Sequence, residues 1–322
     1  MTILSLAFPA NAGETLYHIK QDGKEGYIDE QGQIRIPPQF ESAWPFSEGL
    51  ARVGLHGKYG FINLRGEIVI PPRFDLASGA GFREGLAAVQ LNGQWGYVDQ
   101  GGNMVIPTQF AGTGAFSEGL APVRNHHFQD GFIDRQGNLV IPFSYEDAGG
   151  FSEGKAAVRV GRRYGYIDRT GKMVIRPRFQ EAGTFRDGLA TVRKGAKFGC
   201  IDHHGKLVIP PRFESLGKFY EDLALAQIGG KWGYIDRKGK LVIKPRYYDA
   251  GPFFSGLAKV SMKNGGAYGY IDRAGRVVIP FKFEMGGEFV GNLAEVLWQG
   301  KWVYIDRTGR MVWQSQLPYR KD

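Results

Sequence analysis

The stretch Lys231–Tyr247, KWGYIDRKGKLVIKPRY, holds aromatic, acidic and basic residues close together and has the appearance of an active-site motif. Variants of it occur nine times along the chain. Such regularity marks a tandem-repeat fold in which each repeat is one supersecondary unit. The aspartate column of the motif, whose members are 34 to 36 residues apart, consists of Asp29, Asn63, Asp99, Asp134, Asp168, Asp202, Asp236, Asp272 and Asp306.

Each repeat predicts three β-strands. In the third repeat, the first strand is GLAAV (85–89), and the turn Asn92-Gly93 is of the kind that closes a two-residue hairpin. The second strand is WGYVD (95–99), followed by the D-x-x-G sequence of the repeats, in which Asn63 stands for Asp in the second repeat. The third strand, MVI (104–106), runs into a proline, which cannot donate to a ladder and is expected to end the pairing.

The third strand is apolar at consecutive positions, as in Leu207-Val208-Ile209, which predicts that both of its faces are covered. Three strands alone are marginally stable, so the repeats must stack. We therefore predict an all-β fold of nine three-stranded β-meander units of about 35 residues in a curved array. An open β-solenoid or superhelix is favoured for two reasons. About 35 residues is short for a four-stranded blade, and no repeat is divided between the two ends of the array to close a ring. A closed β-propeller is the alternative.

The N-terminal residues predict export. An apolar segment, Ile3–Phe8, precedes Ala10-Asn11-Ala12, the small-x-small pattern of a signal-peptidase site; a frayed apolar tail is the alternative. We expect a signal-peptide remnant over 1–12, one repeat array over 13–313 and a C-terminal tail over 314–322. The expected location is periplasmic, extracellular or in the cell envelope, and otherwise cytoplasmic. No apolar run approaches the roughly 20 residues of a transmembrane helix.

The sequence offers little chemistry. Asp at the first and Gly at the fourth position of D-x-x-G is typical of a type I turn, and Asn63 serves a turn equally well. The acidic residues before the first strand, such as Glu84, are expected to be solvated. The histidine pairs 126–127 and 203–204 are poor chelators because adjacent side chains point apart, and Cys200 substitutes for a buried aromatic residue. We therefore expect no enzyme activity, catalytic residue, metal or cofactor.

With its motifs KWGYID, YGYID and GLAxV, the chain from Tyr17 to Trp313 resembles the WG repeat family, or KWG repeats, of bacterial tandem-repeat proteins. The resemblance implies tandem β repeats, often without an assigned activity. Three repeats depart from the pattern: Glu25 and Asp130 stand where the aromatic residue is usual, and Val303 stands for the glycine. Departures in the first and last repeats are typical of repeats that cap the ends of an array, whereas the sequence does not explain the departure at Asp130.

Charge is distributed unevenly. The chain has a net charge of +9; residues 1–160 carry 12 Lys/Arg and 17 Asp/Glu, whereas residues 161–322 carry 29 and 15. Much of the excess recurs at three positions of each repeat, which in a stacked array would form a basic ridge. The residues of this predicted ridge are Arg169, Lys172, Arg178, Lys206, Arg212, Arg237, Lys240, Arg246, Arg273, Arg276, Arg307 and Arg310.

A basic ridge attracts anionic polymers and makes their binding salt-dependent; surface solubility is the plainer explanation of the same charges. The first functional hypothesis is a non-enzymatic interaction scaffold for an anionic envelope polymer, a membrane surface or an acidic protein. The alternative is a structural spacer or assembly protein that binds no small ligand and associates through strand edges. A nucleic-acid partner is not expected if the protein is exported, and the chain contains no known nucleic-acid-binding module.

Overall fold

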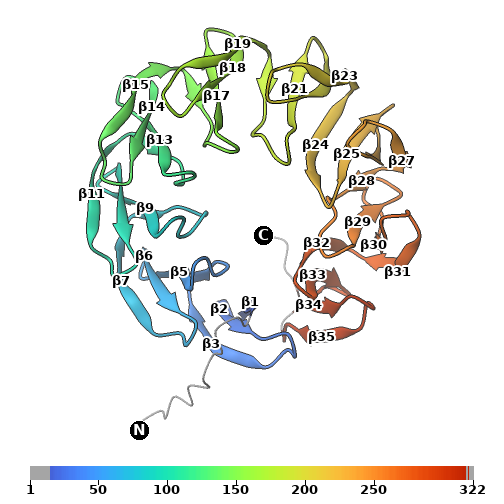
Figure 1. Cartoon of the computed structure of the whole chain (residues 1–322). Helices are drawn as coiled ribbons and strands as arrows, with labels where there is room; N and C mark the ends of the chain where they lie inside the picture. The colour runs from blue at the N-terminus through green and yellow to red at the C-terminus, as the bar shows by residue number, and fades with distance from the viewer. Residues whose placement is uncertain (1–14, 317, 319–322) are drawn as a thin grey trace. The chain divides into compact units, whose positions relative to one another are not determined.

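In the computed structural model, residues 15–316 and 318 are described, and the predicted signal-peptide remnant lies outside them. The described residues form β-strands and no helix, and the chain divides into two compact units, 1–150 and 151–322. No described segment is a helix long and apolar enough to span a membrane. Figure 1 colours the first unit from blue to green and the second onward to red.

The strands of the first unit are β1 (Tyr17–Gln21), β2 (Lys24–Ile28), β3 (Ile34–Phe40), β4 (Ser42–Ala43), β5 (Leu50–Leu55), β6 (Lys58–Asn63), β7 (Ile68–Phe74), β8 (Leu76–Ala77), β9 (Leu86–Leu91), β10 (Gln94–Asp99), β11 (Met104–Phe110), β12 (Gly112–Thr113), β13 (Leu120–Arg124), β14 (Asp130–Asp134), β15 (Leu139–Tyr145) and β16 (Asp147–Ala148).

Those of the second unit are β17 (Lys155–Val160), β18 (Arg163–Asp168), β19 (Met173–Phe179), β20 (Glu181–Ala182), β21 (Ala190–Lys194), β22 (Lys197–Ile201), β23 (Leu207–Phe213), β24 (Ser215–Tyr220), β25 (Leu223–Ile228), β26 (Lys231–Ile235), β27 (Leu241–Tyr247), β28 (Asp249–Ala250), β29 (Ala258–Ser261), β30 (Tyr268–Ile271), β31 (Val277–Phe283), β32 (Met285–Val290), β33 (Leu293–Trp298), β34 (Lys301–Asp306) and β35 (Met311–Gln314).

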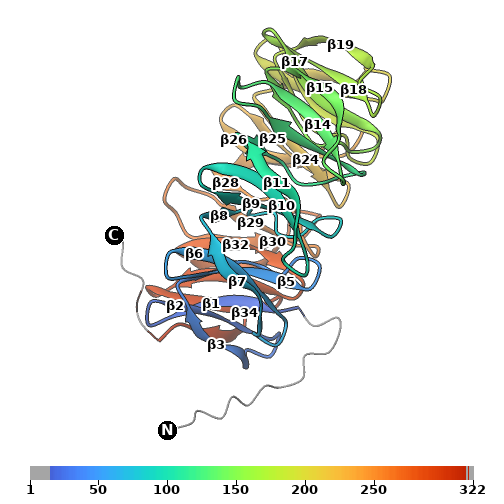
Figure 2. The same ribbon diagram turned by 90° about the vertical axis from the view of Figure 1, so that its left-hand side faces the viewer.

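Each repeat folds into an antiparallel sheet, which we call a blade. The blade of the second repeat has the strand order β4-β5-β6-β7. Its central hairpin pairs Leu55 with Lys58 around His56-Gly57, both of which have positive φ, as a type I′ turn requires. Figure 2 shows β6 and β7 of this blade running side by side.

The prediction of three strands per repeat holds only for the first blade, β1-β2-β3; later blades have four. The additional strand is as short as two residues, as in β8, and lies in the glycine-rich connection between repeats. Such a short segment has no apolar periodicity to reveal it. Because this strand is so short, a four-stranded blade fits within about 35 residues, and the expectation that the repeat is too short for one was wrong. The repeats have the blade topology of a β-propeller, the alternative fold, rather than that of the favoured solenoid.

The third strand continues through its proline. In the second repeat Tyr59 pairs with Phe74 and Phe61 with Ile70, so the segment 71–73 bulges out opposite Gly60. A Cβ atom on Gly60 would lie 2.4 Å from the Ile70 carbonyl oxygen. The glycine of the aromatic-Gly-aromatic motif therefore makes room for a backbone bulge of the neighbouring strand.

The core lies between successive blades. One cluster contains the fully buried Phe61, Ile70 and Phe74 together with Phe82 and Val89 of the next repeat. The two residues before the isoleucine are not covered: Ile68 is 49% and Val69 37% exposed. The prediction that both faces of the third strand are covered was therefore wrong. This strand lies at the sheet edge, and in the second repeat its residues that reach the core are Ile70 and Phe74.

Candidate functional site

The aspartate of the repeated motif stabilises a turn by accepting backbone hydrogen bonds. In the segment Lys231–Tyr247, Asp236 Oδ1 accepts the N–H groups of Lys238 at 2.9 Å and Lys240 at 2.8 Å, and Gly239 N–H donates to the Asp236 carbonyl. Asn63 Oδ1 accepts the equivalent pair in the second repeat. The turn interpretation is confirmed, and the carboxylate is occupied by backbone donors.

The tyrosine of the motif joins one blade to the next. Tyr234 is buried, its hydroxyl donates to the Gly251 carbonyl at 2.8 Å, and its ring lies 4.8 Å from that of Phe253. Burial raises the pKa of this hydroxyl, so it acts as a donor. Corresponding bonds are made by Tyr27, Tyr97, Tyr166 and Tyr270.

The acidic residue before the first strand is not simply solvated, contrary to the prediction. Glu84 accepts the N–H of Gly119 at 3.0 Å, one repeat further along the chain, and Glu153 accepts that of Gly188 at 2.9 Å. Each carboxylate thus binds the equivalent turn of the following blade. The sequence showed the periodicity of these residues but not their partner, because donor and acceptor are 35 residues apart.

The predicted basic ridge separates into three sets with different surroundings. The first set directly follows the motif aspartate and comprises Arg169, Arg237, Arg273 and Arg307. Arg237 donates to the carbonyl of Asp187 and lies 3.7 Å from its carboxylate; Arg273 donates to the Glu221 carbonyl. Arg307 lies beside Gly256, in the equivalent turn one blade earlier, whereas Arg169 is exposed. This set mainly cross-links blades.

The second set, Arg178, Arg212 and Arg246, also connects blades. Each Nη2 donates to the carbonyl of a D-x-x-G glycine in the next repeat, at 2.5 Å to Gly205, 2.5 Å to Gly239 and 2.8 Å to Gly275. Each guanidinium also lies 5.0–5.1 Å from the centroid of the ring that follows it in sequence. These arginines are held by structural contacts even though their side chains reach the surface.

The third set follows the turn glycine, and we call it the exposed cation row: Lys172, Lys206, Lys240, Arg276 and Arg310. Arg276 is paired only with Asp272 of its own turn at 2.6 Å, with its side chain 82% exposed. Arg310 is paired likewise with Asp306 at 3.0 Å. Lys206 and Lys240 are exposed and form no salt bridge within the described ranges. Of the three sets, this one has cations not engaged between blades.

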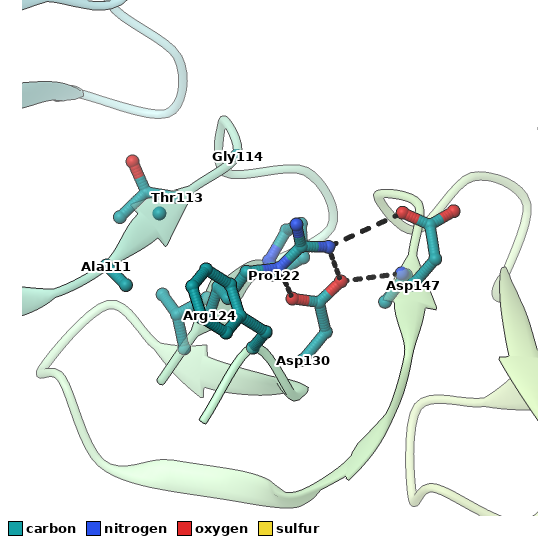
Figure 3. Close-up of a pocket in the computed structure, with 11 residues that line it drawn as sticks. Ala111, Thr113, Gly114, Pro122, Arg124, Asp130 and Asp147 are labelled. Carbon is teal, nitrogen blue, oxygen red and sulfur yellow. Dashed lines mark hydrogen bonds and ion pairs between the residues drawn. The ribbon is translucent and has the colours of Figure 1, made fainter. Parts of the chain in front are cut away.

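A pocket of about 380 Å³ lies in the first unit, in the fourth repeat that departs from the pattern. Its lining comes from β12, β13, the start of β14 and β16. Asp130 is buried and receives Arg124 Nε at 2.7 Å and Arg124 Nη2 at 2.8 Å. Asp130 also accepts the Ala148 N–H at 2.9 Å, and Asp147 lies 3.6 Å from Arg124. Figure 3 shows Arg124 between the two carboxylates.

The unexplained departure at Asp130 now has a structural role. Glu25, the other acidic residue in the aromatic column, accepts the N–H of Ala43 in the same relative position, 18 residues ahead. In both repeats a carboxylate binds the first strand of the next blade where other repeats place a ring. The anomaly in the sequence was the signal for this site, but its partners required the fold.

The remaining candidates are placed as follows. Cys200 is fully buried, and burial raises the pKa of its thiol to about 12, in keeping with a residue packed in the core. His203 Nε2 lies 3.0 Å from the Glu153 carboxylate and stacks on Phe185. Among residues 15–316 and 318, no group of three or more His, Cys, Asp or Glu side chains is arranged to hold a metal ion.

The fold is shared with solved structures of low sequence identity. A eukaryotic initiation factor matches with a TM-score of 0.66 at 11% identity, covering 96% of this chain and 98% of that one. BamB from Moraxella catarrhalis matches with 0.51 at 13% identity, covering 92% and 95%. The dihydro-heme d1 dehydrogenase NirN matches with 0.52 at 16% identity, covering 91% and 78%. These similarities concern the fold alone.

No curated protein matches the chain by sequence. A family model described as the WG containing repeat matches eight successive segments, 26–59, 59–95, 95–126, 131–163, 164–198, 198–232, 232–265 and 268–302. Together they span nearly the whole repeat array predicted from the motif spacing. The chain therefore belongs to the WG repeat family.

Proposed function

We propose that the protein is a non-enzymatic binding scaffold and that the exposed cation row in its second unit binds an anionic polymer, an anionic membrane surface or an acidic protein. The observation that carries the proposal is the difference between the three basic sets. Two sets are largely engaged in contacts between blades, whereas the row projects exposed cations from the same turn of five successive repeats.

A repeated cation suits a repetitive anionic partner. Charges at equivalent turns act together on a chain or surface that spans several of them, although each alone contributes little. Residues 161–322 have 29 basic and 15 acidic residues, so the surrounding field reinforces the row. Binding of this kind weakens as ionic strength rises, because salt screens exposed charges beyond about 10 Å at 0.1 M.

The test is binding of poly-glutamate and of phosphatidylglycerol-containing vesicles to the full chain. The variant Lys206→Glu, Lys240→Glu, Arg276→Glu, Arg310→Glu is expected to lower affinity at least tenfold. The control reverses four exposed cations outside the row: Arg162→Glu, Lys194→Glu, Lys218→Glu and Lys263→Glu. Because the net charge of both variants is the same, equal losses of affinity would show that the row has no special role.

The proposed location is the cell envelope, based on the Ile3–Ala12 pattern. Fractionation combined with the intact mass of the native protein tests it. A mature chain beginning at Gly13 in the envelope fraction is the expected result. An uncleaved chain in the cytoplasmic fraction would contradict export and would direct the search toward acidic cytoplasmic partners.

Assembly is the second candidate function, favoured by one observation: the edge strands carry exposed apolar pairs, such as Leu241-Val242 and Val277-Val278. If the protein assembles, its molecular mass in solution should rise with protein concentration. Charge-reversing substitutions in the exposed cation row should not alter this rise. Replacing Val242 and Val278 by lysine should abolish this association, and a monomer at every concentration would eliminate the candidate.

A further inference from the structure

In the fourth repeat, the loop of the central hairpin comprises residues 125–129 and is longer than the two-residue turn of the second and third repeats. Asn125 Oδ1 accepts the N–H groups of His127 at 2.9 Å and Gln129 at 3.0 Å, and Phe128 N–H donates to the Asn125 carbonyl at 3.1 Å. These bonds fix the connection between β13 and β14. The loop is therefore held in one conformation beside the pocket that it helps to line.

Phe128 lies in that loop with φ of 60° and with 73% of its surface exposed. A left-handed backbone conformation is strained and uncommon for a bulky residue. The corresponding turn in the third repeat, Asn92-Gly93, ends in a glycine. The fourth repeat instead presents an aromatic ring to solvent at the pocket.

The polar lining of the pocket contains two carboxylates and one guanidinium. Both Asp130 oxygens are bound by Arg124, and one also by the Ala148 N–H, while Asp147 lies 3.6 Å from the same guanidinium. A cationic ligand would compete with Arg124 for these carboxylates, and an anionic ligand would approach two carboxylates. A neutral ligand with hydroxyl groups can donate to Asp147 and accept from the guanidinium without displacing the Arg124–Asp130 pair.

We propose that this pocket binds a neutral pyranose ring, either a monosaccharide or the end of a glycan. The apolar C–H face of a pyranose fits an aromatic ring such as Phe128, and its hydroxyl groups fit the alternating acceptors and donors of Asp147 and Arg124. The volume of about 380 Å³ lies within the roughly 300–1,000 Å³ of small-molecule sites. The site is in the first unit and is independent of the exposed cation row.

Ligand-observed saturation-transfer NMR on the full chain tests the proposal, with methyl glucoside, methyl galactoside and methyl mannoside as probes. Transfer to the ring C–H protons of at least one pyranoside is expected. Phe128→Gly removes the ring and also relieves the backbone strain, so it should fold at least as well and raise Kd at least tenfold. Phe128→Tyr should keep binding, as should the control Tyr248→Ala, which removes an exposed ring in the second unit.

Two charged probes distinguish other ligand classes. Agmatine supplies a guanidinium cation and glucose 6-phosphate an anion. Asp147→Asn should change pyranoside affinity only a few fold, because an amide oxygen still accepts a hydroxyl proton. The proposal is overturned if no pyranoside shows transfer, if transfer survives Phe128→Gly, or if agmatine binds more tightly than the pyranosides and loses that binding in Asp147→Asn.

Discussion

Replacing Gly96 by alanine should destabilise the protein strongly, because the glycine faces a backbone bulge. Its Cβ atom would lie 2.4 Å from the Ile106 carbonyl oxygen and 2.8 Å from Thr108 N. An ordinary contact needs about 1 Å more, so the third strand would have to retreat. Overpacking costs about 1–3 kcal/mol and a lost backbone hydrogen bond about 1 kcal/mol, so we expect the free energy of unfolding to fall by about 2–4 kcal/mol.

The assay is urea unfolding followed by tryptophan fluorescence and circular dichroism. Gly79→Ala is the matched control, since Gly79 lies in the same unit, does not have positive φ and would place no atom within 4 Å of its Cβ. That variant should be neutral or stabilising by up to about 1 kcal/mol. Equal effects of the two substitutions would refute the reasoning. The last repeat already tolerates a side chain here, because Val303 pairs with Gln314 without a bulge opposite it.

Three further predictions concern individual side chains. Arg212→Ala should lower the free energy of unfolding by about 1–2 kcal/mol, because it removes the donor to the Gly239 carbonyl. The control Lys206→Ala should change that free energy by less than about 0.5 kcal/mol, and urea unfolding of both variants measures the difference. The Thr170 side chain, through its hydrogen bond, holds the pKa of Asp168 below its ordinary value of 3.8, so this contribution to stability is present above that value and lost as pH falls through the folded pKa. Asp168→Asn should keep the turn, as Asn63 does, and should lose less stability in an acid titration followed by circular dichroism. Cys200 should resist iodoacetamide in the folded protein and react on unfolding, as mass spectrometry of the alkylated protein would show; rapid labelling of the folded chain would contradict its burial.

The exact recurrence of short-range motifs determined much of the local structure. The D-x-x-G turn and the two-residue hairpins each depend on contacts within a few residues. Asp236 and its turn donors Lys238 and Lys240, for example, are at most four residues apart. Local backbone geometry restricts such segments so strongly that residue type and spacing suffice to predict them. The repeat length, its nine occurrences and the all-β class followed in the same way.

The tertiary structure decided which groups face each other across blades. Residue pairs such as Tyr234 and Gly251, or Glu84 and Gly119, are 17 and 35 residues apart and meet only after neighbouring sheets pack. The same packing divided one predicted basic ridge into two sets engaged largely between blades and one exposed row. Charge and period were visible in the sequence, but the partner of each arginine depends on which strand lies opposite, and a periodic sequence is compatible with several such arrangements.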